Sequence, residues 1–280
     1  MNEAFVIGVD IGGTKIRICS ARPERPDRIL YTITIPTARS FAQAQPDILQ
    51  AIHILLEGAP VAAIGISSPG PVSRKKGTIG HPTNLHWSQA RIVQWLTSLW
   101  DCPVALWNDA AAGGICEAQF GSARRHRYAL YVSISTGIGT ALTLDGWPLP
   151  GRHNSEGGRI HLGTDAASPT FEQISSGTAI LKRYGRIARD ITNKADWHDI
   201  SARMAVGLHN LIVTTDPDIV VLGGGVSLHH ARFLPSLKRE LKLCRPMYAL
   251  PPIVPATHIE HAPLIGAMRA ALAEHYENLR

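Results

Sequence analysis

The sequence predicts an α/β protein with two lobes and a central cleft. Apolar runs typical of buried strands alternate with segments of helical periodicity, and a glycine-bearing turn follows a strand in each half of the chain. The 280 residues are enough for two lobes, since a chain of this size buries roughly 75% of its unfolded surface. We expect an N-terminal lobe at residues 1–112, onto which a C-terminal helix at about 263–280 packs back, and a larger lobe at residues 113–262.

In the N-terminal lobe, an apolar run at residues 5–8 predicts a buried strand that turns at glycines and returns as a second strand. Alternating β-branched residues at 29–35 predict a third strand that completes a meander. Helical spacing at residues 43–56 ends in Glu-Gly-Ala-Pro, a typical helix stop, and a buried strand follows at 61–67. The same patterns predict a helix at 92–100, a strand at 103–107 and a helix of small residues at 110–120.

The C-terminal lobe repeats this plan. Its predicted elements are strands at 128–135 and 140–144 turned at Asp145-Gly146, helices near 177–190 and 198–215, and a strand at 219–222. The final helix, at about 264–277, is the one expected to pack back on the N-terminal lobe.

The two glycine turns carry the most information about function. Residues 9–15 read Val-Asp-Ile-Gly-Gly-Thr-Lys, and residues 133–140 read Ser-Ile-Ser-Thr-Gly-Ile-Gly-Thr. Because glycine has no Cβ, the backbone N–H groups of such a turn can approach an anion closely, and a neighbouring hydroxyl adds a donor. Two such turns facing each other would hold a polyphosphate from both sides, so the pair predicts a duplicated nucleotide-phosphate cleft.

Further polar segments lie where ligand-contacting residues are expected. The strand at 219–222 runs into Gly223-Gly224-Gly225, which is either a platform for a flat group such as adenine or a tight turn before a helix. Asn108 and Asp109 follow a strand at its C-terminal end, where open α/β sheets place ligand contacts, although Asp109 also fits an N-cap. Residues 83–87 (Thr-Asn-Leu-His-Trp), Glu156 and Glu172 offer further groups for a hydroxyl-rich ligand.

Composition narrows the class of protein. The net charge of +6 comes partly from basic runs at 124–127 and 74–76 and from arginines near residues 22–28, with no interleaved aromatic residues, which favours solvated loops over a nucleic-acid site. Four scattered cysteines favour reduced thiols. The sequence shows neither an uninterrupted apolar stretch of about 18 residues nor a signal-peptide pattern at its start, so we expect a cytoplasmic protein without a membrane span.

These segments, in this order, resemble the ROK family (repressors, open reading frames and sugar kinases) of the actin-like ATPase superfamily, with its ribonuclease H-like fold. The resemblance spans nearly the whole chain. It rests on residues 10–15 (Asp-Ile-Gly-Gly-Thr-Lys), 68–72 (Ser-Pro-Gly-Pro-Val), Asn84-Leu85, 108–110 (Asn-Asp-Ala), 136–139 (Thr-Gly-Ile-Gly), 223–226 (Gly-Gly-Gly-Val) and 264–267 (Leu-Ile-Gly-Ala).

The resemblance implies phosphate transfer from ATP, with Mg²⁺, to a hexose hydroxyl in a homodimeric enzyme. Asp109 would be the general base, and Asp10 would orient the magnesium through water. The implied sugar contacts are Gly70, Asn84, Asn108, Asp109, Glu156, Arg159 and Glu172. The implied nucleotide contacts are Asp10, Gly12, Gly13, Thr14, Lys15, Thr136 and Gly137, with Gly224 and Gly225 facing the adenosine.

The chain departs from the family pattern in one segment. Many members carry Gly-Glu-x-Gly-His followed by a zinc loop with three cysteines, but here Arg159 stands in place of the histidine and residues 163–170 contain no cysteine. His153 and His161 flank the segment as expected loop residues, so no structural zinc is expected. Arg159 could pair with Glu156 or Glu172 and brace the loop, or face the ligand and select an acidic or modified sugar, or weaken Asp109 as a base by lowering its pKa.

Three functional hypotheses follow. The first is a glucokinase-like or other hexokinase, with fructose, N-acetylmannosamine or N-acetylglucosamine as alternative substrates. The second is a sugar-responsive repressor, which we do not expect, because a strand at residue 5 leaves no room for the helix-turn-helix domain of such proteins. The third is a non-catalytic sugar-binding member, against which Asp109 and both glycine turns argue, while Arg159 keeps it open.

Overall fold

The computed structural model describes residues 3–151, 154–244 and 249–278, with side chains up to residue 274 in the last segment. The chain forms two compact units, the first comprising Met1–Cys116 with His261–Arg280 and the second Glu117–Glu260. The boundaries expected from the sequence, after residues 112 and 262, lie within four residues of these divisions.

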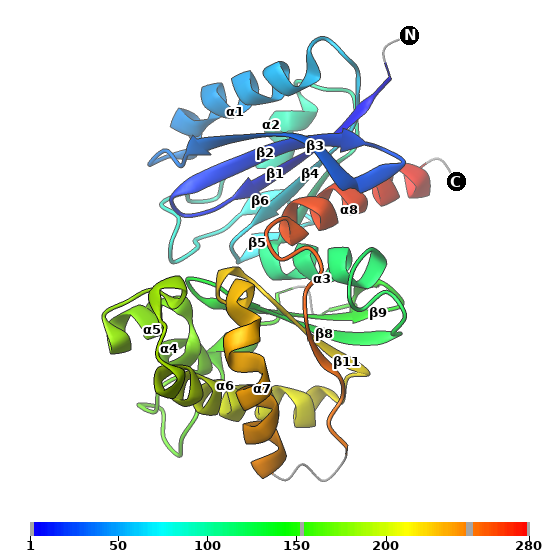
Figure 1. Ribbon diagram of the computed structural model, residues 1–280. Helices are drawn as coiled ribbons and strands as arrows, with labels where there is room; N and C mark the ends of the chain where they lie inside the picture. Colours follow the sequence, from blue (N-terminus) through cyan, green and yellow to red (C-terminus); the bar gives the residue numbers. More distant parts are fainter. Residues whose placement is uncertain (1–2, 152–153, 245–248, 279–280) are drawn as a thin grey trace. The chain divides into compact units, whose positions relative to one another are not determined.

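The first unit is built on a five-stranded sheet with strand order β3-β2-β1-β4-β7 (Figure 1). Strand β1 pairs antiparallel with β2 and parallel with β4, and β4 pairs parallel with β7. The strands are β1 (Phe5–Ile11), β2 (Lys15–Arg22), β3 (Arg25–Pro36), β4 (Val61–Ser68) and β7 (Val104–Asn108). A small hairpin, β5 (Val72–Ser73) and β6 (Thr78–Ile79), follows β4. The predicted meander and its two parallel neighbours are thus confirmed.

Helices cover both faces of this sheet. On one face, α1 (Phe41–Leu56) and α2 (Ile92–Thr97) bury isoleucines of β1, β2 and β4. Helix α1 begins where the Ser40 hydroxyl accepts the N–H of Gln43, in a capping box. On the other face lies α8 (Ala262–Asn278), which approaches β4 so closely that a Cβ at Gly65 would overlap the backbone of Ala267. The expected packing of the last helix on the N-terminal sheet is observed.

The second unit repeats the sheet. Its strand order is β10-β9-β8-β11-β12, with β8 antiparallel to β9 and parallel to β11. The strands are β8 (Tyr128–Ile134), β9 (Ile138–Leu144), β10 (Trp147–Pro148), β11 (Ile219–Gly223) and β12 (Ile253–Pro255). In both units, therefore, the first strand is paired antiparallel with the strand that follows its glycine turn and parallel with a later strand.

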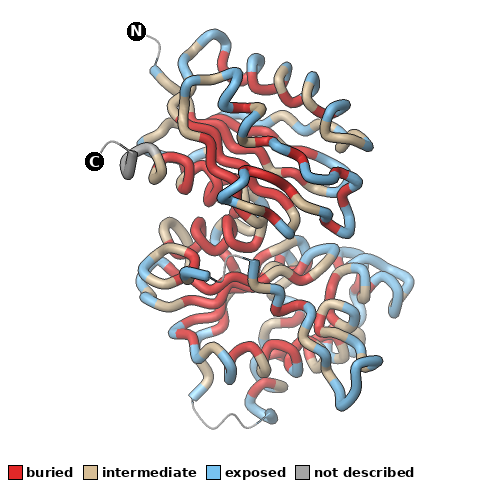
Figure 2. Tube along the Cα trace, turned by 180° about the vertical axis from the view of Figure 1, so that it is seen from behind, coloured by how far each residue is buried: buried red, intermediate tan, exposed pale blue. Residues whose placement is uncertain are grey.

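The core of the second unit lies between its sheet and its helices, and the central strands of both sheets are buried (Figure 2). Leu130 and Val132 of β8 and Leu222 of β11 face side chains of α6 and α7 such as Leu208 and Phe233. The helices are α3 (Asp109–Gln119), which crosses from the first unit, α4 (Phe171–Ser175), α5 (Gly177–Tyr184), α6 (Lys194–Thr215) and α7 (His230–Leu243). Short 3₁₀ turns occur at η1 (Gly157–Arg159), η2 (Ala188–Asp190) and η3 (Gly225–His229).

Three predicted helix boundaries are wrong. The helix expected at 177–190 ends at Tyr184, because Gly185 takes a left-handed conformation (φ 65°) and its N–H bonds the carbonyl of Leu181. The helix expected from residue 198 begins at Lys194, because Asn193 caps it by accepting the N–H of Ala195. The helix expected at 92–100 ends at Thr97.

None of the helices in the described ranges combines the length and the hydropathy that a bilayer crossing requires. The four cysteines are thiols that form no disulfide, and burial raises the pKa of Cys19 to about 12 and that of Cys102 to about 11.

Asp199 on α6 joins this helix to α5 at the surface of the second unit and makes the free energy of unfolding depend on pH. It accepts hydrogen bonds from Tyr184 (2.5 Å), Arg183 (2.9 Å) and Arg203 (3.0 Å). Burial alone raises its pKa, but these hydrogen bonds outweigh burial and lower the pKa from 3.8 to about 2. A carboxylate with a lowered pKa stabilises the fold above its unfolded pKa and loses this contribution as the pH falls towards 2.

We therefore expect Asp199→Asn to lower the free energy of unfolding at pH 7 by about 1 kcal/mol, because the side chain is 39% exposed and its ion pairs are partly screened. Urea unfolding from pH 7 to pH 2.5 should show the gap between wild type and variant closing below about pH 4. Asp216→Asn, at the exposed C-cap of the same helix, is the matched control and should unfold close to the wild type at pH 7. A gap that stays constant across this range would contradict the assignment.

Candidate active site

The first glycine turn joins β1 to β2 and is held from two sides within the first unit. The N–H of Gly12 bonds the carbonyl of Lys15 at 2.9 Å, and the Thr37 hydroxyl donates to the carbonyl of Gly12 at 2.7 Å. A Cβ at Gly13 would overlap the backbone carbonyl of Asn84. The turn and the Asn84 loop, predicted separately to contact nucleotide and sugar, therefore lie side by side, and glycine at position 13 is required for their approach.

Asp10, near the end of β1, is held by two side chains. Its Oδ1 accepts the Ser67 hydroxyl at 2.8 Å, and its Oδ2 pairs with the Arg17 guanidinium at 2.7 Å. Sequence reasoning missed both partners. The hairpin register offered a signal for Arg17, because it lies directly across from Asp10 on β2. Ser67 lies across from Asp10 on the other side, on β4.

Asn108 and Asp109 stand where β7 ends and α3 begins. The Asn108 side-chain oxygen accepts the N–H groups of Ala110 (3.0 Å) and Ala111 (3.3 Å), so Asn108 is the residue that caps α3. The interpretation of Asp109 as the N-cap is wrong, because the helix already includes Asp109 as its first residue. The Asp109 carboxylate accepts the N–H of Ala110 at 2.7 Å in the first turn of the helix.

The hairpin β5–β6 supports the end of β7 through Arg74, which the sequence suggested was solvated loop charge. Its guanidinium lies over the Trp107 ring, 3.7 Å from the centroid, and pairs with Glu274 of α8 at 2.9 Å. Trp107, next to Asn108, is thereby covered on one face. Gly70, the remaining residue expected to contact sugar in this unit, precedes Pro71 at the start of the hairpin loop through a cis peptide bond.

The second glycine turn joins β8 to β9 and is fastened to α4 and α5. The Thr178 hydroxyl donates to the carbonyl of Thr136 at 2.7 Å, and the N–H of Gly177 bonds the carbonyl of Ser135 at 2.6 Å. The Glu172 carboxylate accepts the N–H of Ile138 at 2.7 Å, and a Cβ at Gly137 would overlap that carboxylate. Glu172, expected to contact sugar, thus lies against the turn expected to contact phosphate.

Arg159 lies on η1 and pairs with Glu156, with 3.3 Å between its Nε and the carboxylate. This is one of the two pairings considered from the sequence. Both side chains are exposed, so the pair is worth at most about 1 kcal/mol.

His161 bonds the carbonyl of Ser168 through Nδ1 at 2.7 Å, and His153 lies outside the described residues. The described residues contain no group of three or more His, Cys, Asp or Glu side chains able to hold a metal.

The three glycines at the end of β11, Gly223 to Gly225, differ in what surrounds them. A Cβ at Gly223 would overlap the Tyr131 ring, and one at Gly224 (φ 80°) would overlap the backbone of Ile134. A Cβ at Gly225 would meet nothing within 4 Å. Tight packing therefore explains the first two glycines, whereas Gly225 leaves an open, exposed stretch of backbone that packing does not require.

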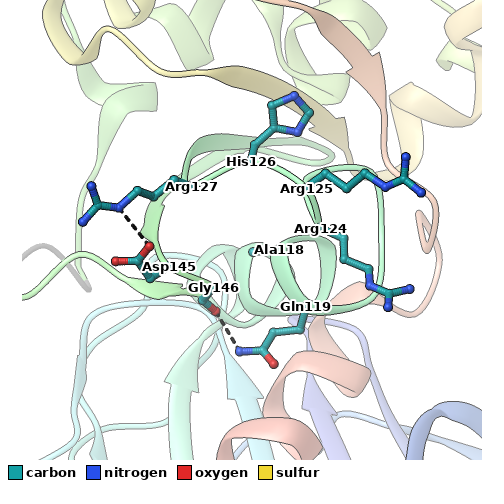
Figure 3. A pocket seen from close by; sticks show the side chains of 8 residues that line it. All are labelled: Ala118, Gln119, Arg124, Arg125, His126, Arg127, Asp145 and Gly146. Atoms are coloured by element: carbon teal, nitrogen blue, oxygen red, sulfur yellow. Dashed lines mark hydrogen bonds and ion pairs between the residues drawn. The ribbon is translucent and has the colours of Figure 1, made fainter.

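A basic cavity of about 480 Å³ lies at the opposite end of β8 and β9 from the second glycine turn (Figure 3). The loop before β8 and the turn after β9 line it, with Arg124, Arg125, His126, Arg127 and Asp145 among the lining residues. Arg127 turns towards Asp145 (3.0 Å), whereas Arg124 and Arg125 extend away from it (Figure 3). Because these cations do not converge and no predicted site residue lines the cavity, it is distinct from the candidate active site.

The duplicated sheet, with a glycine turn after the first strand of each copy, defines the class: this is an actin-like ATPase fold. A solved glucokinase from Streptomyces griseus, in complex with glucose and AMPPNP, has this fold with a TM-score of 0.83 and 23% identity, over 95% of this chain and 99% of that one. The model of the ROK family matches residues 6–275, and the chain belongs to that family.

Relatives within the family include both enzymes and regulators. A fructokinase from Pediococcus pentosaceus is 26% identical over 286 residues, covering 95% of this chain and 96% of the relative. A xylose repressor from Bacillus subtilis is 25% identical over 306 residues, covering 97% of this chain and 78% of the repressor. The names of these relatives therefore do not decide between catalysis and regulation for this chain.

Proposed function

We propose that this chain transfers a phosphoryl group from ATP to a hydroxyl group of a hexose, with Asp109 as the general base. The position of Asp109 carries the proposal. It follows the parallel strand β7 as the first residue of α3, while Asn108 turns back to cap the helix. A carboxylate at the C-terminal end of a parallel strand is placed where α/β sheets bind ligands. The fructokinase and glucokinase relatives support the same reaction class.

The chemistry needs positioning and charge neutralisation more than covalent catalysis. The sugar oxygen attacks the terminal phosphorus of ATP, the bond from that phosphorus to the bridging oxygen breaks, and ADP leaves. Asp109 accepts the proton of the sugar hydroxyl as the new bond forms. The glycine turns at Gly12–Gly13 and Thr136–Gly137, with Thr14 and Lys15, supply donors to the phosphates, and Gly225 offers open backbone to the adenosine.

Asp10 fits a magnesium ion that the nucleotide carries and that water links to the protein. Mg²⁺ at a phosphate site characteristically uses one or two carboxylates and keeps several waters. Asp10 is a single carboxylate, already oriented by Ser67 and Arg17, which matches an outer role better than direct coordination by a protein cage. When bound, the ion would neutralise charge on the transferring phosphate.

We assign sugar contacts to Gly70, Asn84, Asn108, Asp109, Glu156 and Glu172. Glucose is the simplest substrate, and fructose, N-acetylmannosamine and N-acetylglucosamine are the alternatives. The second candidate is a non-catalytic sugar-binding protein, which the repressor relative and the Arg159 exchange favour. A homodimer is proposed on family resemblance.

Release of ADP from MgATP, measured with the purified chain over a panel of hexoses, N-acetylhexosamines and sugar acids, tests the proposal. We expect one or a few neutral hexoses to give turnover well above the hydrolysis seen without sugar. Thermal shift with each sugar in the absence of ATP runs in parallel. Sugar-dependent stabilisation with no ADP release from any sugar would favour the non-catalytic candidate and overturn the kinase.

A further inference from the structure

The position of Glu172 connects the sugar contacts of the second unit with its phosphate turn. Helix α4 is fixed by a capping box, in which Thr170 accepts the N–H of Gln173 and Gln173 accepts that of Thr170. Phe171 anchors the same helix in the core with 1% exposure, against Gly207. The backbone of Glu172 is therefore held firmly, and its side chain reaches the glycine turn from a defined point.

The Glu172 carboxylate bonds a backbone N–H that a nucleotide phosphate would otherwise bond. It accepts the N–H of Ile138, the residue after Gly137, at 2.7 Å and covers the bare face of that glycine. A negative charge at this place has two consequences for a triphosphate. It removes one backbone donor from the turn, and it repels the incoming phosphate oxygens.

Glu156 differs from Glu172 in both respects. Arg159, at 3.3 Å, balances its charge. The residue that follows Glu156 is Gly157, and its N–H bonds the Thr140 side chain of β9, not the glycine turn. The two glutamates share an assigned sugar role, but in the described structure Glu172 is the one bonded to the phosphate turn.

We propose that Glu172 couples sugar binding to nucleotide binding. Without sugar, its carboxylate holds the Ile138 N–H and opposes a triphosphate at Thr136–Gly137. When sugar hydroxyls bond the carboxylate, the N–H becomes available to phosphate and the charge is partly compensated, so nucleotide affinity rises. This inference rests on the proposed assignment of Glu172 to the sugar site.

Such coupling is reciprocal, because two ligands that influence one another's affinity do so by the same factor. Coupling between sites in proteins typically amounts to about 5–150-fold. It would also suit a kinase, since weak ATP binding without sugar limits transfer of phosphate to water.

The test is the affinity for AMPPNP with magnesium, measured by calorimetry with and without a saturating amount of the best sugar of the panel. For the wild type we expect the dissociation constant to fall about tenfold when sugar is present. For Glu172→Gln, which keeps the shape but loses the charge, we expect about tenfold tighter binding without sugar and a sugar effect below twofold. Glu172→Ala, which also removes the acceptor, should behave in the same way.

Glu156→Gln is the matched control. It should weaken sugar binding but leave the tenfold effect of saturating sugar on AMPPNP affinity unchanged. Equal AMPPNP affinity of wild type and Glu172→Gln without sugar, or a full sugar effect in that variant, would overturn the proposal. The sugar-free comparison needs no turnover, so tighter AMPPNP binding by the variant together with an inactive wild type would show failure of the kinase proposal alone.

Discussion

Asp109→Asn is expected to reduce the turnover number for sugar phosphorylation by about 10²- to 10⁴-fold, the usual contribution of a positioned general base. The amide keeps the size of the carboxylate and can still accept the N–H of Ala110, so the start of α3 should persist. The affinity for sugar, measured by calorimetry, should change by only a few fold. Loss of the negative charge at the helix N-terminus costs about 0.3–1 kcal/mol of stability.

The control for this variant is Asp101→Asn, an exposed aspartate in the loop before the same strand, β7. It should match the wild type in turnover, sugar affinity and melting temperature. Near-normal turnover of Asp109→Asn would remove Asp109 as the base. Loss of sugar binding together with turnover would show instead that Asp109 acts mainly in holding the sugar.

Gly225→Leu is expected to weaken nucleotide binding by about tenfold or more, which corresponds to about 1.4 kcal/mol or more of lost contact. The reason is steric. A Cβ at Gly225 meets nothing in the protein, and its backbone is outside the left-handed region, so the variant should fold normally. A leucine side chain would then occupy the open backbone that we assign to the adenosine. Calorimetric titration with AMPPNP and magnesium measures the effect.

Two further substitutions serve as controls for Gly225→Leu. Gly225→Ala should cause a smaller loss of affinity at an unchanged melting temperature. Gly224→Ala should destabilise the fold, because its Cβ would overlap the backbone of Ile134 in a residue with φ 80°. If Gly225→Leu binds AMPPNP as tightly as the wild type, the adenosine lies elsewhere.

Much of the architecture was predictable from local pattern. The alternation in β3, the buried runs of β1, β4, β8 and β11, and the glycine turns that follow β1 and β8 all occur close to the expected residues. Helix ends were less predictable, because single caps decide them. Asn193 starts α6 and Gly185 ends α5, and neither effect is visible in the apolar periodicity.

In the candidate site, too, local features were predictable from the sequence and long-range partners were not. Residue type and position along a strand were enough to single out Asn108, Asp109 and the glycine turns, since strand ends and turns are local features, whereas the role of Asp10 came from the family resemblance. The partners of these residues were not predictable in this way. Glu172 meets Ile138 across 34 residues of sequence, and Arg74 meets Glu274 across 200.

Periodicity and turn chemistry along the chain were therefore sufficient to indicate a duplicated α/β protein and the residues that belong at its strand ends. Tertiary packing alone settled that Ser67 holds Asp10 and that Glu172 lies on the second glycine turn. The physical reason is how far apart in the sequence the interacting residues lie. Backbone conformation follows from neighbouring residues, whereas the partner of a polar side chain depends on which distant segments the packed sheet and helices bring within hydrogen-bonding distance.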